Sequence, residues 1–256
     1  MMIQNSYILN LLKEGKRLDN RKIDEYRKIK IEKNPITQAE GSARIKIGNT
    51  EVLVGVKMDV GEPFPDKPED GVLITNAEFS PLASPNFETG PPREGSIELA
   101  RVVDRGIRES GAIDTKKLCI KKKEKVWMVF VDVQILNHAG NLIDAAGLGA
   151  IVALLNAKMP EYDEKEEKVN YEKKTQPLPV KSNPVPVTQS KVDSTFLIDT
   201  NLEEEDVAEG RITITTKDDG NICSIQKSGS SAFTLDEITK AIDNSINKGK
   251  ELRKLL

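Results

Sequence analysis

The 256-residue chain contains few of the residues on which many enzymes depend. It has 2 cysteines, 1 histidine and 1 tryptophan, and aromatic residues make up 4% of the sequence. A single histidine, His138, excludes a metal site built from several histidines and leaves one possible base for a Ser-His-Asp triad. His138 lies in a predicted turn, where an ordinary structural role is the other interpretation. Cys119 and Cys223 are too few for a disulfide framework, and their apolar surroundings predict small, reduced core residues.

Long apolar runs and cofactor motifs are also missing. The longest run of low polarity, residues 145–155, is far shorter than the roughly 20 residues that cross a bilayer. The first 16 residues lack the basic start and the cleavage pattern of a signal peptide, so we expect a cytoplasmic protein without a membrane partner. No GxGxxG motif follows a strand, and Walker A, CxxC and HExxH motifs do not occur. We therefore expect no cofactor and no metal.

Charged residues, in contrast, are abundant in the chain. Asp and Glu number 41 and Lys and Arg number 38, so that charged residues make up 31% of the sequence and the net charge is -3. Together with 38% apolar residues, this composition is typical of an aliphatic core under a charged surface. Because the net charge is small, any nucleic-acid site has to be a local basic patch.

Hydrophobic periodicity predicts a helical extension over residues 1–25 and a first lobe over residues 26–160. The extension contains a short amphipathic helix at 3–15. Within the lobe we expect a strand at 29–31, a hairpin of strands 44–47 and 52–58 around Gly48-Asn49, a strand from Val72, a helix at 97–110, a central strand at 127–135, and a buried alanine-rich helix capped by Asp144 and ending near Lys158.

A charged and proline-rich composition over residues 161–184 predicts a connection to a second lobe at 185–256. In this lobe we expect strands at 192–198, 211–216 and 222–226. Thr234 and Glu237 predict a capping box for a final helix. Its predicted buried face consists of Leu235, Ile238, Ile242, Ile246, Gly249 and Leu252. Because strands are grouped before helices, the order favours an α+β fold, with mixed sheets packed against helices, over a doubly wound parallel sheet.

Three arginines share the polar side of the predicted helix at 97–110: Arg101, Arg105 and Arg108. This guanidinium stripe is suited to successive backbone phosphates, and Arg93, in the loop before the helix, would extend it. The alternative is that Glu98 and Asp104 neutralise the arginines as pairs within the helix. The spacing alone leaves both interpretations open.

An acidic run, Glu203-Glu204-Glu205-Asp206 with Glu209, allows two interpretations as well. It could bind a divalent metal or hold an acid for phosphoryl chemistry. It could equally be a solvated loop, because consecutive acids point in different directions.

Five segments resemble the RNase PH family, and within it the archaeal exosome ring subunits that lack activity of their own: residues 40–57, 71–78, 98–110, 126–133 and 220–229. The resemblance implies the RNase PH fold, which is similar to the second domain of ribosomal protein S5. It also implies a hexameric ring of three heterodimers with an active RNase-PH-like subunit, a trimer of RNA-binding cap subunits, and single-stranded RNA in the central channel.

Catalytic relatives degrade RNA from its 3′ end by phosphorolysis, and the resemblance implies that this chain lacks their catalytic groups. Their phosphate cradle, a Gly-Ser-Arg turn, corresponds to Asn141-Leu142-Ile143, where neither apolar side chain donates a hydrogen bond. Their catalytic acid falls at about Gly210-Arg211, with Asp206 and Glu209 nearby. Arg101 and Arg105 best match the arginines that the inactive subunits lend to the RNA path.

We therefore expect a non-catalytic component of a 3′-to-5′ phosphorolytic RNA-degrading complex, which helps to structure the partner's active site and contributes to RNA binding. The alternative is a chain that itself phosphorolyses RNA, with Asp206 or Glu209 as its acid. A third possibility is an RNA-binding module that forms no ring.

Overall fold

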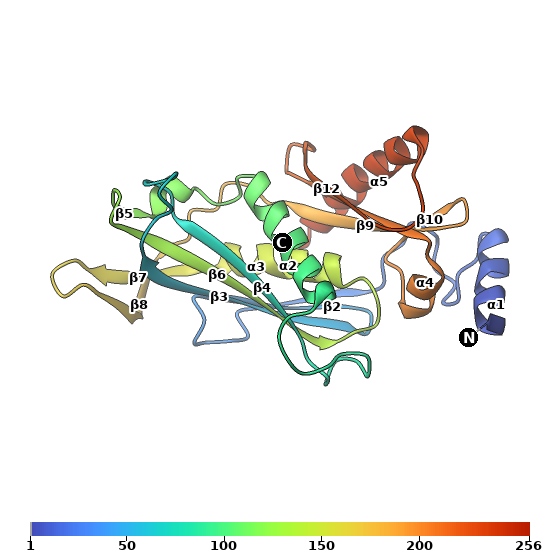
Figure 1. Cartoon of the computed structure of the whole chain (residues 1–256), viewed down its shortest axis with the longest axis horizontal. Coiled ribbons are helices and arrows are strands. Elements are labelled where there is room, and N and C mark those ends of the chain that lie inside the picture. Colours follow the sequence, from blue (N-terminus) through green and yellow to red (C-terminus); the bar gives the residue numbers. More distant parts are fainter. Residues whose placement is uncertain (1) are drawn as a thin grey trace.

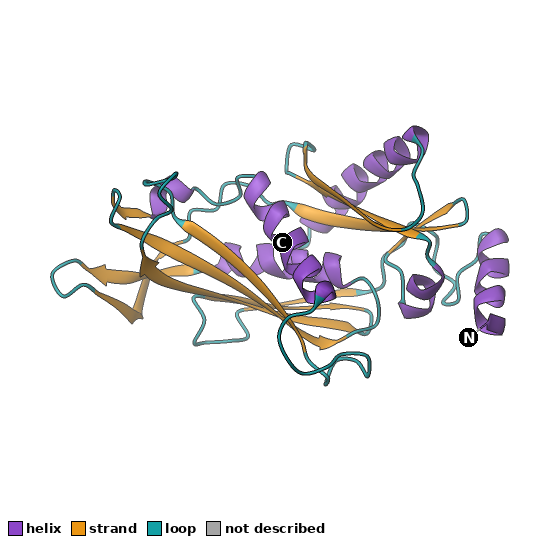
Figure 2. Ribbon diagram, in the orientation of Figure 1, coloured by secondary structure: helices purple, strands orange, loops and turns teal. Residues whose placement is uncertain are grey.

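The computed structural model describes residues 2–256, and the side chains of residues 6–174 and 176–256. A six-stranded sheet, a four-stranded sheet, a two-stranded hairpin and the helices form an α+β fold, as the order of predicted elements indicates (Figures 1 and 2). The larger sheet has the order β1-β2-β3-β6-β4, with β5 paired to β6. Its strands are β1 (Ile29–Lys33), β2 (Gly41–Ile47), β3 (Thr50–Gly61), β4 (Val72–Phe79), β5 (Cys119–Lys121) and β6 (Lys125–Asn137).

Strand β6 is central, which its run of apolar residues predicts. It pairs antiparallel with β3 and parallel with β4. Alternate residues of β3 and β6, such as Val54 and Val131, are fully buried on one face of the sheet. The predicted hairpin around Gly48-Asn49 is present as β2 and β3.

The smaller sheet is antiparallel, in the order β10-β9-β11-β12. Its strands are β9 (Val185–Val192), β10 (Thr195–Ile198), β11 (Gly210–Thr216) and β12 (Ile222–Gly229). The helices are α1 (Met2–Lys13), α2 (Glu94–Glu109), α3 (Leu142–Asn156), α4 (Leu202–Val207) and α5 (Leu235–Arg253), with a short 3-10 turn at Thr115–Leu118.

Helix α3 lies between the two sheets and forms the centre of the core (Figure 1). It contacts β2 and β3 of the larger sheet and β9 of the smaller one. Small residues allow this close approach. A Cβ atom added at Gly41 would lie 2.3 Å from the Ala153 carbonyl oxygen, and one added at Gly147 would lie 2.3 Å from Pro186 Cγ. The predicted buried, alanine-rich helix is therefore present, but it begins earlier than predicted.

The predicted cap of α3 is wrong. Asn141, with φ 54°, precedes the helix as its N-cap, and Asp144 is a buried residue of the first turn. The sequence favours Asp144 as the cap, because the left-handed conformation of Asn141 leaves no pattern in a sequence.

One prediction in the second lobe is also wrong in detail. The predicted strand at 192–198 is two strands, β9 and β10, because Asp193 has a φ of 55° and reverses the chain. Pro186 argues against a strand at the true start of β9, because proline cannot donate a backbone hydrogen bond. It is tolerated there because β10 pairs with β9 no further than Gln189, so that at Pro186 only β11 lies beside β9. The charged segment also contains an antiparallel hairpin of β7 (Lys158–Asp163) and β8 (Lys168–Pro177).

The two ends of the chain pack on the smaller sheet. Ile8 and Leu12 of α1 are buried against Val192 and Leu197, while the side chain of Ile3 lies outside the described residues. The predicted capping box of Thr234 and Glu237 opens α5.

The predicted buried face of α5 needs correction. Its buried line is Ala241, Ser245, Gly249 and Leu252. Leu235 is 79% exposed, and the three isoleucines of the predicted face are half-buried. The small residues lie innermost because α5 packs closely on β9 and β11.

Candidate nucleic-acid interface

Helix α2 forms one wall of a cleft of about 870 Å³. Leu99, Val102 and Val103 anchor the helix in the core. Gly106 allows it to approach β11, since an added Cβ atom would lie 3.3 Å from Thr215 Cγ2. Burial of this face leaves the arginine side of α2 in solvent.

The structure separates the predicted arginines. Arg101 and Arg105 are exposed and line the cleft, and neither has an ion pair within the described residues. Arg108 is held by both carboxylate oxygens of Asp104, each at 2.9 Å, and also donates to the Leu73 carbonyl oxygen. The hydrogen bond to Asp104 raises the pKa of Arg108. The neutralising interpretation therefore holds for Arg108.

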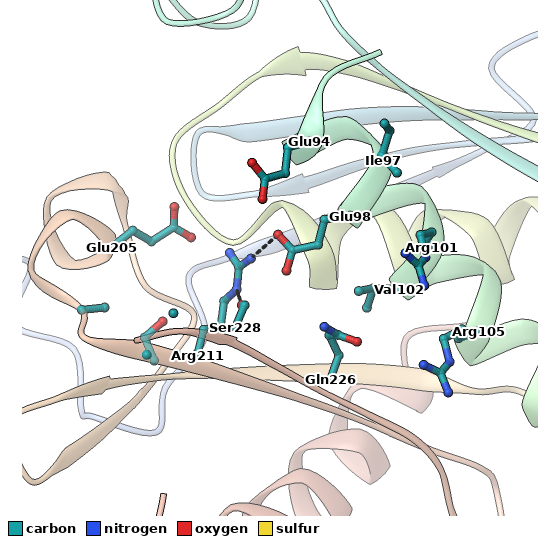
Figure 3. A pocket seen from close by; sticks show the side chains of 14 residues that line it. Glu94, Ile97, Glu98, Arg101, Val102, Arg105, Glu205, Arg211, Gln226 and Ser228 are labelled. Carbon is teal, nitrogen blue, oxygen red and sulfur yellow. Dashed lines mark hydrogen bonds and ion pairs between the residues drawn. The ribbon is translucent and has the colours of Figure 1, made fainter. Parts of the chain in front are cut away.

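Glu98 makes a different contact from the one that the helix pattern suggests. It accepts a hydrogen bond at 3.2 Å from Arg211 of β11, across the cleft. Arg211 also donates to Ser228 Oγ at 3.2 Å. Figure 3 shows these groups at one side of the cleft, with Arg101 and Arg105 at the opposite side. Gln226 and Ser228 of β12 form the wall that faces α2.

Arg93 lies apart from this cleft. It is the N-cap residue of α2, it forms an ion pair with Glu88, and it lines a separate hollow formed by the loop before the helix. Its side chain is 70% exposed. The structure thus places two of the four predicted arginines together in the cleft.

The start of α3 borders a small cavity of about 150 Å³ that is lined by Leu142, Ile143, His138, Glu205 and Arg211, among others. The Asn141 N–H donates to Glu205 Oε1 at 2.7 Å. Neither Leu142 nor Ile143 has a side chain that can donate to an anion. We call the N-terminal end of α3, where backbone N–H groups point away from the helix, its amide end. A carboxylate of the chain itself, that of Glu205, therefore occupies this amide end.

His138 has the structural role that was one of its two interpretations. Its ring stacks on Phe87 with a centroid distance of 5.3 Å, and its Nδ1 accepts a hydrogen bond from the Gly140 N–H. Burial, with the charge of Arg27, lowers its pKa.

Behind the cavity, a buried polar network holds the first turn of α3. Asp144 accepts hydrogen bonds from the Tyr26 hydroxyl at 2.7 Å, from the Thr188 N–H at 3.1 Å and from Asn141 Nδ2 at 3.1 Å. Burial raises the pKa of Asp144 to about 6 and, with the Asp144 charge, raises that of Tyr26. Burial would also raise the pKa of Asp199, but hydrogen bonds and charge from Arg27 outweigh it and lower that pKa.

The acidic run is a short helix, so its interpretation as a solvated loop is wrong in part. Glu204 is fully buried and receives two hydrogen bonds from Arg17, at 2.8 and 2.6 Å. Asp206 and Glu209, the candidate acids of the enzyme alternative, are exposed and are not lining residues of the cleft. Among the residues that the structure describes, no group of three or more His, Cys, Asp or Glu side chains could hold a metal ion.

Sequence patterns missed several residues of this region. Alternation along 222–229 would place Gln226 and Ser228 on one face of a strand, but it does not show that this face meets α2. No pattern in the neighbouring sequence indicates that Arg17 binds Glu204 of α4, or that Arg27 binds Asp199 in the turn after β10. Both cysteines are free and half-buried rather than fully buried, and burial raises the pKa of Cys223 to about 11.

Comparison with known proteins shows the family. Residues 25–160 match the model of the 3′ exoribonuclease family, domain 1, and residues 182–248 match domain 2 of the same family. The chain belongs to the RNase PH family. The first match alone covers more than half of the chain.

Relatives within the RNase PH family are similar over nearly their whole length. The chain is 55% identical to an exosome complex component Rrp42 of Thermococcus onnurineus over 253 residues, which cover 98% of this chain and 93% of the relative. It is 50% identical to the protein of the same name from Methanosarcina acetivorans over 254 residues, with 99% and 93% covered.

Solved structures agree with this RNase PH assignment. A chain of the Archaeoglobus fulgidus exosome with RNA bound to the active site superimposes with a TM-score of 0.92 at 48% identity, over 98% of this chain and 97% of that one. A chain of an archaeal exosome core gives a TM-score of 0.87 at 45% identity, over 98% and 95%. The RNase PH fold that the sequence predicts is confirmed. No helix in residues 2–256 is long and apolar enough to cross a membrane.

Proposed function

We propose that this chain is a non-catalytic component of an exosome, where it pairs with an active RNase-PH-like subunit and lends Arg101 and Arg105 to the RNA. The observation that carries the proposal is the cleft. It presents two exposed arginines without ion pairs among the described side chains. Leu142, Ile143 and the Glu205 carboxylate line the small cavity at the start of α3, where an attacking phosphate would bind.

The comparisons support the assembly. Relatives that match over nearly their whole length are named exosome components, and one similar structure is an exosome with RNA bound to its active site. We propose three heterodimers in a hexameric ring, a trimer of RNA-binding cap subunits on one face, single-stranded RNA in the channel, and the cytoplasm as its location.

The chemistry of the arginines supports RNA contact. A charge-assisted hydrogen bond from a guanidinium to a phosphate contributes about 1.5 to 3 kcal/mol before ordering costs. Such contacts hold a single strand without reading its sequence. Arg93 and Arg108 stay predicted contacts, and to reach RNA they must first leave Glu88 and Asp104.

Within this function we propose that residues 26–160 and 185–256 act as two lobes. Residues 1–25 form the helical extension, and residues 161–184 form the connection. The hairpin of β7 and β8 lies mostly within that connection and extends away from the smaller sheet (Figure 1).

A first experiment tests the absence of catalysis. The purified chain is incubated with oligo(A) and inorganic phosphate, without its partner, and released nucleoside diphosphate is measured. We expect no release above a blank, because the chain has no anion-binding side chain at the start of α3 and no acid in the cleft at position 210 or 211. Release that is abolished by Asp206→Asn or Glu209→Gln would establish the enzyme alternative.

A second experiment tests the RNA contact. In the reconstituted complex, Arg101→Glu with Arg105→Glu is expected to weaken oligo(A) binding at least tenfold and to reduce its salt dependence. Lys240→Glu with Lys250→Glu, on the exposed side of α5, changes the charge equally and serves as the control. Unchanged affinity and salt slope in the arginine variant, with the ring intact, would remove the contact.

A further inference from the structure

We propose that Glu205 is a built-in anion: its carboxylate accepts the hydrogen bond of the Asn141 N–H at the amide end of α3 and keeps phosphate out of the small cavity there. The proposal assigns Glu205 the role of a specificity-determining residue. Its consequence for RNA rests on the proposed function, but the exclusion of phosphate does not.

The contact lies at a helix start that lacks an ordinary side-chain cap. Asn141 is the N-cap residue of α3, but its side chain makes no capping hydrogen bond. Asn141 Nδ2 instead donates to Asp144 Oδ2 at 3.1 Å and to Asp199 Oδ1 at 2.9 Å. The Asn141 N–H donates to Glu205 Oε1 at 2.7 Å, from a helix 64 residues further along the chain. A side chain from elsewhere in the fold thus supplies the negative charge that a helix N-terminus favours.

Glu205 also compensates a second positive group. Burial raises the pKa of Glu205, while the hydrogen bond from the Asn141 N–H and the charge of Arg211, which lines the same small cavity, oppose that rise in part. Without the Glu205 carboxylate, the amide end of α3 and the Arg211 guanidinium would border the cavity together. Backbone amides and a guanidinium are the groups that proteins use to bind phosphate.

Acidic groups around Glu205 strengthen the exclusion. Glu94 and Glu98 line the same cleft, and two buried oxygens beside α3, Asn141 Oδ1 and Asp144 Oδ1, have no hydrogen-bond partner among the described residues. An incoming phosphate would meet the carboxylates of Glu94 and Glu98 as well as that of Glu205, and the two buried oxygens add no positive group behind them. Figure 3 shows Glu205, Glu94 and Glu98 on the side of the cleft away from Arg105. A bound RNA would therefore keep its phosphates at the Arg101 and Arg105 end.

The test measures thermal unfolding of the full-length chain as inorganic phosphate is raised, with chloride at matched ionic strength as the reference. Glu205→Gln keeps the size of the side chain and removes its charge, and Glu205→Ala removes the group. For both variants we expect a saturable rise in Tm of roughly 2 to 5 °C at ten times the Kd. The unmodified chain and the control Glu203→Gln, an exposed residue of the same helix, should show no such rise.

Saturable binding of phosphate to the unmodified chain with the same shift, or no binding to either Glu205 variant, would overturn the proposal. Since no RNA is present, either outcome is separate from a failure of the arginine experiment.

A second measurement needs no variant. In the unmodified chain, the amide proton resonance of Asn141 should move with pH as Glu205 titrates, with a midpoint above that of an ordinary glutamate. The charged or titratable groups that face Glu205 and have to be followed in parallel are Arg27, Glu98, His138, Asp199 and Arg211. Asp144, which accepts a hydrogen bond from the Asn141 side chain and has a pKa of about 6, is removed from the measurement by repeating it in Asp144→Asn. If the Asn141 amide proton shift does not change over the pH range in which the Glu205 carboxyl titrates, the contact is contradicted.

Discussion

At the scale of single residues, the first turn of α3 shows how burial changes charged groups. Asp144 is 1% exposed, and Asp199 is fully buried. Asp199 faces Arg27 and keeps its charge, whereas the donors around Asp144 are neutral. A charged partner outweighs the cost of burial, and neutral donors do not.

Asp144 predicts a specific pH dependence of stability. Because its pKa is about 6 in the folded chain and 3.8 is the ordinary value, the folded state binds the proton more tightly. Its contribution therefore favours folding at low pH and is lost as pH rises from about 4 to about 6. Asp144→Asn, which keeps one acceptor oxygen, should stabilise the chain by roughly 1 to 3 kcal/mol at pH 7 and have little effect at pH 4.

Urea unfolding of both proteins from pH 4 to pH 8 checks this difference. Asn10→Ala, at an exposed position of α1, is a control that should leave the pH dependence unchanged. A difference between the two proteins that does not vary with pH would contradict the raised pKa.

At the scale of elements, the contact between α3 and β2 fixes the position of α3 in the core. Small residues on both elements allow the backbones to approach, and the position of α3 in turn sets the amide end that Glu205 reaches. Gly41 is the closest point of this contact. An added Cβ atom there would lie 2.7 Å from both the nitrogen and the Cα atom of Ala157, and backbone atoms cannot move aside as a flexible side chain can.

Gly41→Ala should therefore destabilise the chain by about 3 kcal/mol or more, through overpacking. Gly55→Ala is the matched control in β3, because an added Cβ atom there would have no atom within 4 Å. It should be neutral or slightly stabilising. Denaturant midpoints of the two variants measure the difference, and equal midpoints would show that α3 can shift away from β2.

At the scale of the whole molecule, the chain leaves large apolar side chains in solvent. Phe64 is 57% exposed, Leu82 82% and Leu235 79%. A closed ring of alternating subunits covers such groups, because it leaves no interface unpaired. This agrees with the proposed heterodimers.

Co-expression with an active RNase-PH-like subunit should therefore give a complex whose native mass corresponds to three copies of each chain. Native mass spectrometry or light scattering measures it, with the chain expressed alone as the reference. A monomer that persists beside the active subunit would instead favour an RNA-binding module that forms no ring.

Local patterns in the sequence were enough for most elements and for the family. Alternating valines predict β6, apolar residues at helical spacing predict α2, and Thr234 with Glu237 predicts the start of α5, because each of these depends on neighbours along the chain. The turns at Asn141 and Asp193 were missed, since a left-handed residue other than glycine leaves little trace in composition.

The site depended on contacts between distant segments. The sequence placed Arg101, Arg105 and Arg108 on one helix face, but only the tertiary structure separated Arg108, which Asp104 holds, from the two arginines that face β12. It alone brought Glu205 to the amide end of α3, because that contact joins residues 64 apart along the chain. The periodicity of a sequence indicates which face of a helix or strand is buried. Which side chain from another element lies against that face is decided by the packing of the whole fold.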